Sequence, residues 1–304
     1  MNVLLTILLL TFSARLTSLP IAQNPVYLSH SGPRAERVIP VEKMVTPPVK
    51  EDILSLGPRL SAESAIVVDK ESGAVLFEKN SRQRHAIASI TKLMTALVFF
   101  ESNPDLEARV KMTEDENREG GDEFIKPGEE ASLRDYLVAS LLGSANNATI
   151  VLSRSANMDA EAFINRMNQK ARELGMYDTW FEEPTGLSPN DTSTARDITR
   201  LLNEAAKNDA IKSITGTNIS TVRVYPRGIR RTVLTTNHLL GTIVFVEFGK
   251  TGYLDESLYN LAVSVATRPG HELYIVTFGS KSNEERVQDA KSLAVWAEKT
   301  YSWE

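Results

Sequence analysis

Cysteine is absent from this sequence, and the four histidines (His30, His85, His238 and His271) are widely separated. The absence of cysteine excludes disulfide scaffolds, thiol nucleophiles, zinc fingers and iron–sulfur clusters. No two histidines are close enough in the sequence to form a metal-binding motif. We therefore predict a chemistry that uses no thiol, no metal and no cofactor.

Positive charge is not in excess either. The 304 residues include 34 Lys and Arg against 39 Asp and Glu, a formal net charge of −5, and no strongly basic block is present. This balance argues against a nucleic-acid partner, because such binding depends on neutralising phosphates. Hydrophobic residues make up 42% and charged residues 24%, as in a soluble globular protein with one large domain or two small ones.

A hydrophobic run long enough to span a membrane is also missing. The most apolar segment, residues 3–12, has ten residues where a spanning helix needs about 20. It is typical of the apolar part of a secretory signal, although no Lys or Arg precedes it, and a buried helix or strand is the alternative. We predict a signal peptide over residues 1–22, a proline-rich linker over 23–61 and a folded domain over 62–304. The protein is then exported, as a periplasmic or secreted protein, with no stable membrane anchor once the signal is removed.

Strand-like segments lie at both ends of the folded domain, and helical segments lie between them. β-Branched runs bounded by turn residues predict strands over 65–69, 74–78, 242–248, 258–267 and 272–279. Apolar patterning and capping residues predict helices over 91–101, 132–143, 159–174, 194–206 and 283–300. This order predicts an α+β domain with an antiparallel sheet of about five strands, flanked by helices, and a helical insert.

Several well-known catalytic motifs are absent. The sequence contains no G-x-G-x-x-G, no phosphate-binding G-x-x-x-x-G-K-[ST], no G-x-S-x-G and no H-E-x-x-H. A Ser-His-Asp triad needs no fixed spacing, and nothing in the sequence supports one. The remaining candidates for catalytic residues are serines, lysines and their neighbours.

Ser89 and Lys92 form the first candidate catalytic pair. A serine and a lysine three residues apart lie on one face of a helix, about one turn apart. Partial burial of Lys92 in an apolar helix would disfavour its charged form and let it act as a base for the Ser89 hydroxyl. Free N–H groups at the helix start would favour negative charge on a substrate oxygen. Because S-x-x-K is expected about once in a chain of this length, a helix cap with an unrelated lysine is the alternative.

Lys250, Thr251 and Gly252 form a second candidate, at the end of a strand-like run. K-T-G arises by chance in fewer than about one chain in five. The cation and the hydroxyl can hold a carboxylate, and we expect the glycine to let a ligand lie against the strand. A turn at a strand end with a solvated lysine is the alternative.

Three S-x-N sequences occur, beginning at Ser144, Ser155 and Ser188, whereas chance alone yields about one. Ser144 with Asn146 is the preferred candidate, because it follows a buried helix ending at Gly143, where a turn can project both side chains into a cleft. We predict that Ser155 caps the following helix and that Ser188 lies in a proline-containing turn.

Taken together and in this order, S-x-x-K, S-x-N and K-T-G resemble the active site of the serine penicillin-recognising enzymes. Residues 87–97 (IASITKLMTAL), 174–202 and 235–241 (TTNHLLG) are similar to the low-molecular-mass penicillin-binding proteins that act as D-alanyl-D-alanine carboxypeptidases and endopeptidases. The resemblance covers about residues 62–300. It implies a penicillin-binding-protein/β-lactamase-like fold, a role in cell wall biogenesis and cell shape, and peptidoglycan stem peptides and β-lactams as the molecules bound.

The resemblance also implies a role for each matching residue. Ser89 would be the acylated nucleophile, Lys92 its base, and Ser144 the relay of the proton to the leaving amine. The residues implied to bind substrate are Asn146, Lys250, Thr251, Gly252 and Tyr253. Asn146 would orient the substrate amide, and the lysine and threonine of K-T-G would bind the terminal carboxylate of the D-Ala-D-Ala stem. The oxyanion hole would be formed by the backbone N–H groups of Ser89 and Tyr253.

The sequence departs from the family pattern after Tyr253. Family members commonly continue with T-x-x-A-G, whereas Leu254–Asn260 has the sequence LDESLYN, which affects the substrate preference. Thr199 stands where a class A β-lactamase would have the glutamate of E-x-x-L-N, which disfavours that activity. We predict a serine-type D-Ala-D-Ala carboxypeptidase that hydrolyses peptidoglycan stem peptides through an acyl-enzyme on Ser89. The alternatives are an endopeptidase that cuts cross-links with the same site and a non-catalytic peptidoglycan-binding relative.

Overall fold

The structure is a computed structural model that describes residues 45–303, with the exception of residues 119, 268 and 269. The predicted signal peptide (residues 1–22) and residues 23–44 of the predicted linker lie outside this part of the chain. Within it, no helix is both long and apolar enough to cross a membrane.

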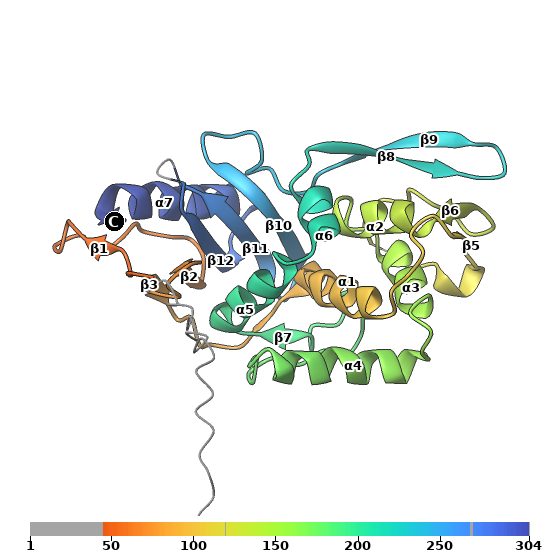
Figure 1. The fold of residues 1–304 in the computed structure, drawn as a ribbon, viewed down its shortest axis with the longest axis horizontal. Coiled ribbons are helices and arrows are strands. Elements are labelled where there is room, and N and C mark those ends of the chain that lie inside the picture. Colours follow the sequence, from red (N-terminus) through yellow and green to blue (C-terminus); the bar gives the residue numbers. More distant parts are fainter. Residues whose placement is uncertain (1–44, 119, 268–269, 304) are drawn as a thin grey trace, which may run out of the picture. The chain divides into compact units, whose positions relative to one another are not determined.

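The central element is an antiparallel five-stranded sheet, as predicted (Figure 1). Its strands, in spatial order, are β10 (Phe245–Leu254), β11 (Leu258–Ala266), β12 (Glu272–Ser280), β2 (Ser64–Asp69) and β3 (Val75–Lys79). All six residues of β2 are buried, since this strand lies between two others and is covered on both faces. Alternate residues of β2 enter different clusters: Ala65 and Val67 pack with the last helix, and Ile66 and Val68 pack with the helical insert.

Helices cover both faces of the sheet. The last helix, α7 (Asn283–Thr300), packs on β11 and β12, and α5 (Ala195–Ala205) packs on the opposite face. The remaining helices are α1 (Thr91–Glu101), α2 (Leu133–Leu141), α3 (Asn146–Arg154), α4 (Ala160–Glu173) and α6 (Asp209–Thr215). Ser132 and Thr194 cap α2 and α5 by accepting hydrogen bonds from backbone N–H groups, as their spacing to Asp135 and Asp197 predicts. Asp159 caps α4 in the same way.

Two helices were not predicted. Helix α3 begins directly after the Ser144 turn, and α6 follows α5 closely. The prediction that Ser155 caps a following helix is wrong, because Ser155 ends α3 and Asp159 caps α4. Helix α3 escapes the pattern because its first flanking residue is Ala145, which has no side chain that can cap.

Short strand pairs complete the fold. They are β1 (Val49–Lys50) with β13 (Tyr301–Ser302), β4 (His85–Ala86) with β7 (Thr192–Ser193), β5 (Arg109–Lys111) with β6 (Glu130–Ser132), and β8 (Ile219–Val224) with β9 (Ile229–Leu234). The β8–β9 hairpin forms a long arm that runs over α2 and β6 (Figure 1). In the linker segment, Ser55 accepts a hydrogen bond from Trp296 of α7 (2.7 Å), so residues 45–61 are held against the last helix.

Candidate active site

The turn that carries Ser89 is held between two glycines. Ser89 lies in a short 3₁₀ turn, η1 (Ala88–Ile90), directly before α1, and Ala88 has a φ of 51°, in the left-handed region. A Cβ atom on Gly252 would lie 2.5 Å from the carbonyl oxygen of Ile87, and one on Gly186 would lie 2.0 Å from that of Ala88. The glycine of K-T-G therefore lets β10 pack directly on the nucleophile turn, whereas the sequence predicted that it admits a ligand. The strained backbone at Ala88 is of the kind found at functional sites.

Lys92 is fully buried on α1, and its amine meets Ser89. Nζ donates to Ser89 Oγ (2.8 Å), to Asn146 Oδ1 (2.7 Å) and to the carbonyl oxygen of Thr185 (2.6 Å). Asn146 Oδ1 and the carbonyl oxygen of Thr185 can only accept hydrogen bonds, whereas the Ser89 hydroxyl can also donate one. A neutral amine has two N–H groups and one lone pair, so it would satisfy both acceptors and receive the proton of Ser89.

Burial lowers the pKa of Lys92 from its ordinary value to about 7, because a charged ammonium loses its hydration there. The carboxylates of Glu183 and Asp191 act in the opposite direction and raise it. The result is a lysine whose pKa is close to neutral pH, where a general base works best. Burial also raises the pKa of Asp191 to about 7.

A loop between α4 and α5 supplies the carbonyl group that Lys92 contacts. Glu183 organises this loop: its carboxylate accepts hydrogen bonds from the backbone N–H groups of Thr185 (2.8 Å) and Leu187 (2.7 Å), and also from that of Gly186. The same carboxylate thus shapes the loop and influences the charge of the amine. Both residues lie in the segment 174–202 that resembles the family, but no motif in the sequence indicates a role for Glu183 or Thr185.

The opposite wall of the site is formed by β10 and the Ser144 turn. Lys250 is 1% exposed, and its Nζ donates to Ser144 Oγ (2.9 Å) and to the carbonyl oxygen of Thr251 (3.0 Å). Ser144 has a φ of 61°, a second strained residue at the site. Burial, and next the positive charges of Lys92 and Arg286, hold the pKa of Lys250 well below its ordinary value.

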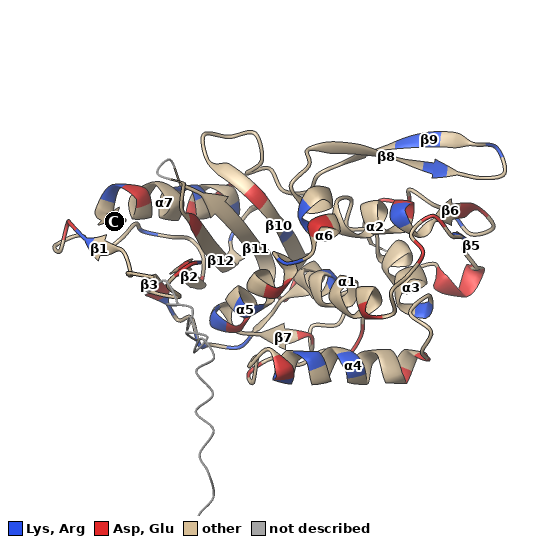
Figure 2. Ribbon diagram, in the orientation of Figure 1, with Lys and Arg blue, Asp and Glu red and all other residues tan. Residues whose placement is uncertain are grey.

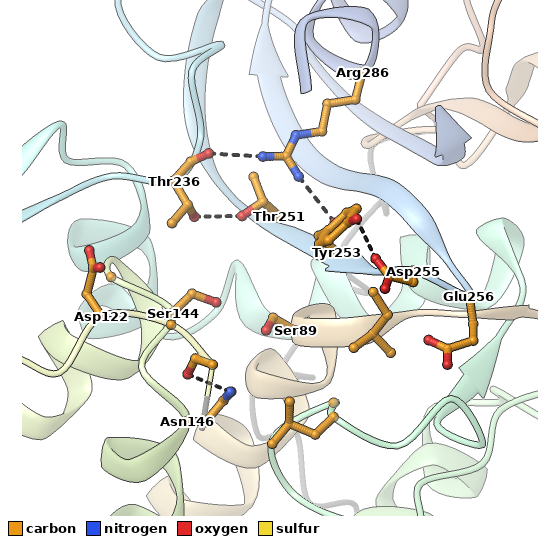
Figure 3. Close-up of a pocket in the computed structure, with 17 residues that line it drawn as sticks. Ser89, Asp122, Ser144, Asn146, Thr236, Thr251, Tyr253, Asp255, Glu256 and Arg286 are labelled. Carbon is orange, nitrogen blue, oxygen red and sulfur yellow. Dashed lines mark hydrogen bonds between the residues drawn. The ribbon is translucent and has the colours of Figure 1, made fainter. Parts of the chain in front are cut away.

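Between these walls lies a pocket of about 700 Å³ (Figure 3). Its lining includes Ser89, Ser144, Asn146, Thr251, Gly252 and Tyr253. Asn146 is engaged at both ends, since its Nδ2 donates to the carbonyl oxygen of Gly120 (2.8 Å) while Oδ1 accepts from Lys92. The predicted role of Asn146 in orienting a substrate amide stays a prediction. The structure shows in addition that Asn146 contacts Lys92.

Two pocket residues were not singled out from the sequence. Thr236 Oγ1 forms a hydrogen bond with Thr251 Oγ1 (2.6 Å), and Arg286 of α7 donates to the carbonyl oxygens of Thr236 (3.3 Å) and Gly252 (3.2 Å) (Figure 3). Burial lowers the pKa of Arg286 to about 10. Two hydroxyls and a guanidinium at one end of the pocket suit a carboxylate. Thr236 belongs to the TTNHLLG segment, whereas the position of Arg286 in a charged helix offers no signal.

The other S-x-N sequences do not enter the pocket. Ser155 lies at the end of α3, and Ser188 lies in an exposed loop where it contacts Glu182. Among the described residues, no group of three or more His, Asp or Glu side chains is arranged to hold a metal ion.

Residues 51–282 match the sequence pattern of the D-alanyl-D-alanine carboxypeptidase family. This chain belongs to that family. The resemblance to low-molecular-mass penicillin-binding proteins predicted from the three motifs is thereby confirmed, as is the serine-type D-Ala-D-Ala carboxypeptidase/endopeptidase class.

Relatives of both activities are found. A D-alanyl-D-alanine endopeptidase of Pseudomonas aeruginosa is 34% identical, over 83% of this chain and 82% of its own length. A D-alanyl-D-alanine carboxypeptidase of Bacillus subtilis is 32% identical over 74% of this chain, which spans 59% of that protein. Among solved structures, a DD-transpeptidase of Streptomyces is 25% identical with a TM-score of 0.75, over 79% of this chain and 98% of that one. The α+β penicillin-binding-protein fold is therefore confirmed.

Proposed function

We propose that this chain is a serine D-alanyl-D-alanine carboxypeptidase that removes the terminal D-Ala from peptidoglycan stem peptides. The observation that carries the proposal is the hydrogen bond of 2.8 Å between Lys92 Nζ and Ser89 Oγ at the pocket, made by a lysine whose pKa burial lowers to about 7. This arrangement provides a nucleophile together with its base. Membership of the peptidase family supports the same substrate class.

In the acylation step, neutral Lys92 takes the hydroxyl proton of Ser89, and Oγ attacks the carbonyl carbon of the penultimate D-Ala. The oxyanion that forms is placed at the N–H groups of Ser89 and Tyr253, the donors that the family resemblance implies. A proton then passes through Ser144, which Lys250 holds at 2.9 Å, to the leaving amine as the C–N bond breaks. Water hydrolyses the ester on Ser89 and restores the free hydroxyl.

The carboxylate of the leaving D-Ala belongs at the end of the pocket lined by Thr236, Thr251 and Arg286. Lys250 lies behind Ser144 and holds its hydroxyl through a hydrogen bond from a buried amine. Recognition of a terminal carboxylate favours the carboxypeptidase over a peptidase for internal bonds.

An endopeptidase that cuts cross-links with the same site is the second candidate, and the endopeptidase relatives favour it. Digestion of purified monomeric pentapeptide muropeptides and of cross-linked dimers separates the two. Release of D-Ala from the monomer with intact dimers supports the carboxypeptidase. Conversion of dimers to monomers without release of D-Ala supports the endopeptidase.

The acyl-enzyme is tested with a fluorescent penicillin, because β-lactams would acylate the same serine. We expect one adduct, mapped by mass spectrometry to the peptide containing Ser89, and none in Ser89→Ala. The matched control Ser155→Ala, at the end of α3, should be labelled like the unchanged protein. A protein that binds muropeptides but forms no adduct would instead be the non-catalytic relative.

Export to the periplasm or the medium is part of the proposal. It is supported by the apolar run of residues 3–12 and by a substrate that lies outside the cytoplasm. N-terminal sequencing of the protein recovered from its native host tests it, and we expect a start near residue 23. A start at Met1 in a cytoplasmic fraction would contradict it.

A further inference from the structure

The arm formed by β8 and β9 has one buried face and one exposed face. Val222, Val224 and Val233 point inward and join the core beside α2. The six-residue strands are paired from Ile219–Leu234 at the base to Val224–Ile229 near the tip. Every residue of the opposite face is exposed, so this face has no partner within the described chain.

Positive charge is concentrated on this arm. Residues 210–246 contain no Asp or Glu, in a chain whose net charge is −5. The basic residues of this stretch are Lys212, Arg223, Arg227, Arg230 and Arg231. Figure 2 shows basic positions, all of them arginines, along β8 and β9 and no acidic position on either strand. Lys212 lies in α6, where it pairs with Asp209, whereas the hairpin brings the four arginines together although they form no basic block in the sequence.

Two of the arginines are placed unfavourably for stability. Arg223 and Arg230 are direct cross-strand partners on the exposed face. Like charges in this position destabilise a hairpin. Among the residues that the structure describes, neither is paired with a carboxylate, and Arg223 lies over the ring of Tyr225 (5.3 Å). Arg231 on the other face, by contrast, forms a two-fold ion pair with Glu129 (2.5 and 2.6 Å).

The arm is anchored, and it continues into the pocket. Near its tip, the backbone of Tyr225 is hydrogen-bonded to Glu130 in both directions (2.8 and 3.2 Å). At its base, β9 leads within two residues to Thr236, whose hydroxyl bonds to Thr251 in the pocket. Six residues of strand extend for about 20 Å. The base of the arm therefore adjoins the pocket at Thr236.

We propose that the exposed face of the β8–β9 arm binds the peptidoglycan polymer beside the stem peptide that is being cleaved. Arg223 and Arg230, with Arg227 at the turn, would pair with carboxylates of neighbouring stem peptides, because a guanidinium matches a carboxylate in geometry and charge. Thr221 and Thr232, which form the adjacent exposed pair, offer hydroxyls to amides and sugars. Continuity with the pocket favours this occupant over an anionic membrane. The inference rests on the proposed function.

The experiment compares polymeric and small substrates. In Arg223→Gln/Arg230→Gln, we expect co-sedimentation with purified sacculi to weaken about tenfold at low salt, and kcat/KM on sacculi to fall by a similar factor. The kcat/KM on a soluble D-Ala-D-Ala peptide should change less than twofold, because such a peptide is too short to reach the arm. Binding of the unchanged protein should also weaken as salt increases, more steeply than that of the double variant.

The matched control removes two exposed arginines elsewhere, in Arg59→Gln/Arg172→Gln, and should bind sacculi like the unchanged protein. Binding is also measured in the Ser89→Ala background, so that it is assessed even if no acyl-enzyme forms. Equal losses in the arm and control variants would overturn the proposal, since a general charge effect would then be responsible. Arginine-dependent binding to vesicles of anionic phospholipid, with unchanged binding to sacculi, would overturn it in favour of a membrane.

Discussion

Lys92 and Lys250 show how differently one fold can use the same residue type within one site. Both are buried, and each donates to a serine hydroxyl, at 2.8 and 2.9 Å respectively. Two carboxylates near Lys92 offset part of the effect of burial on its pKa, which is about 7. Lys250 instead has two cations nearby, which lower its pKa further.

The difference indicates that Lys92 on α1 and Lys250 on β10 have separate roles in the site. Near Lys92, the opposing effects bring the pKa close to neutral pH, which suits a base that must take and return a proton. Near Lys250, the amine serves to hold Ser144 and to place a donor behind the carboxylate end of the pocket.

Replacement of the proposed base should have the largest effect. In Lys92→Met, we expect the rate of acylation by a fluorescent penicillin to fall about a thousandfold, because Ser89 loses its proton acceptor. Lys212→Met, at a partly exposed lysine of α6, is the control and should leave the rate unchanged. A loss of less than tenfold, in a variant that remains folded by circular dichroism, would remove Lys92 from the role of base.

Replacement of Lys250 should have a smaller effect. In Lys250→Met, Ser144 loses its hydrogen-bond donor, and we expect kcat/KM for a D-Ala-D-Ala peptide to fall about a hundredfold. Rate measurements on a shortened substrate without the terminal carboxylate sharpen the comparison. If the loss is the same with that substrate, Lys250 acts on proton transfer through Ser144 and not on carboxylate binding.

The close packing of β10 on the turn that carries Ser89 can be tested at Gly252. In Gly252→Ala, the new Cβ would meet the carbonyl oxygen of Ile87 at 2.5 Å, so β10 and the Ser89 turn must separate. We expect the free energy of unfolding to fall by about 2–3 kcal/mol, measured by denaturant titration, together with slower acylation. Gly73→Ala is the control, because its new Cβ would meet no atom within 4 Å. Its free energy of unfolding should fall by only about 1 kcal/mol, because alanine is disfavoured at the positive φ of this position. Equal losses in the two variants would show that the close packing at Gly252 has no special cost.

The smallest effect concerns pH. Because Lys92 acts as a base when neutral, the acylation rate should rise with pH, with a midpoint near 7. Glu183 raises the pKa of Lys92, so Glu183→Gln should move the midpoint to lower pH by about half a pH unit. Glu182→Gln, in the neighbouring position, is the control and should leave the midpoint in place. A shift to higher pH in Glu183→Gln would contradict the electrostatic explanation.

Much of the fold follows from local patterns. The predicted helices 91–101 and 283–300 coincide with α1 and α7, because apolar spacing acts over one or two turns. Ser282 also caps α7, whereas α1 has no side-chain cap. The hairpin β8–β9 was missed, although residues 219–224 alternate between exposed and buried and Pro226 and Gly228 mark a turn. Ser220 and Arg231 on the inward face, and Ile219 and Leu234 on the exposed face, break the alternation of apolar and polar residues that predicts a strand.

The amino-acid order alone specifies which residue types are available for the chemistry and where they stand along the chain. Ser89, Lys92, Ser144 and the K-T-G segment could be selected because three short motifs coincide in one chain. The tertiary structure alone decided the contact of Lys92 with Asn146 and Thr185, the burial that lowers its pKa, and the entry of Thr236 and Arg286 into the pocket. The physical reason is that solvation, charge and packing at a side chain depend on neighbours that are far away along the chain, and only the folded arrangement of strands and helices specifies them.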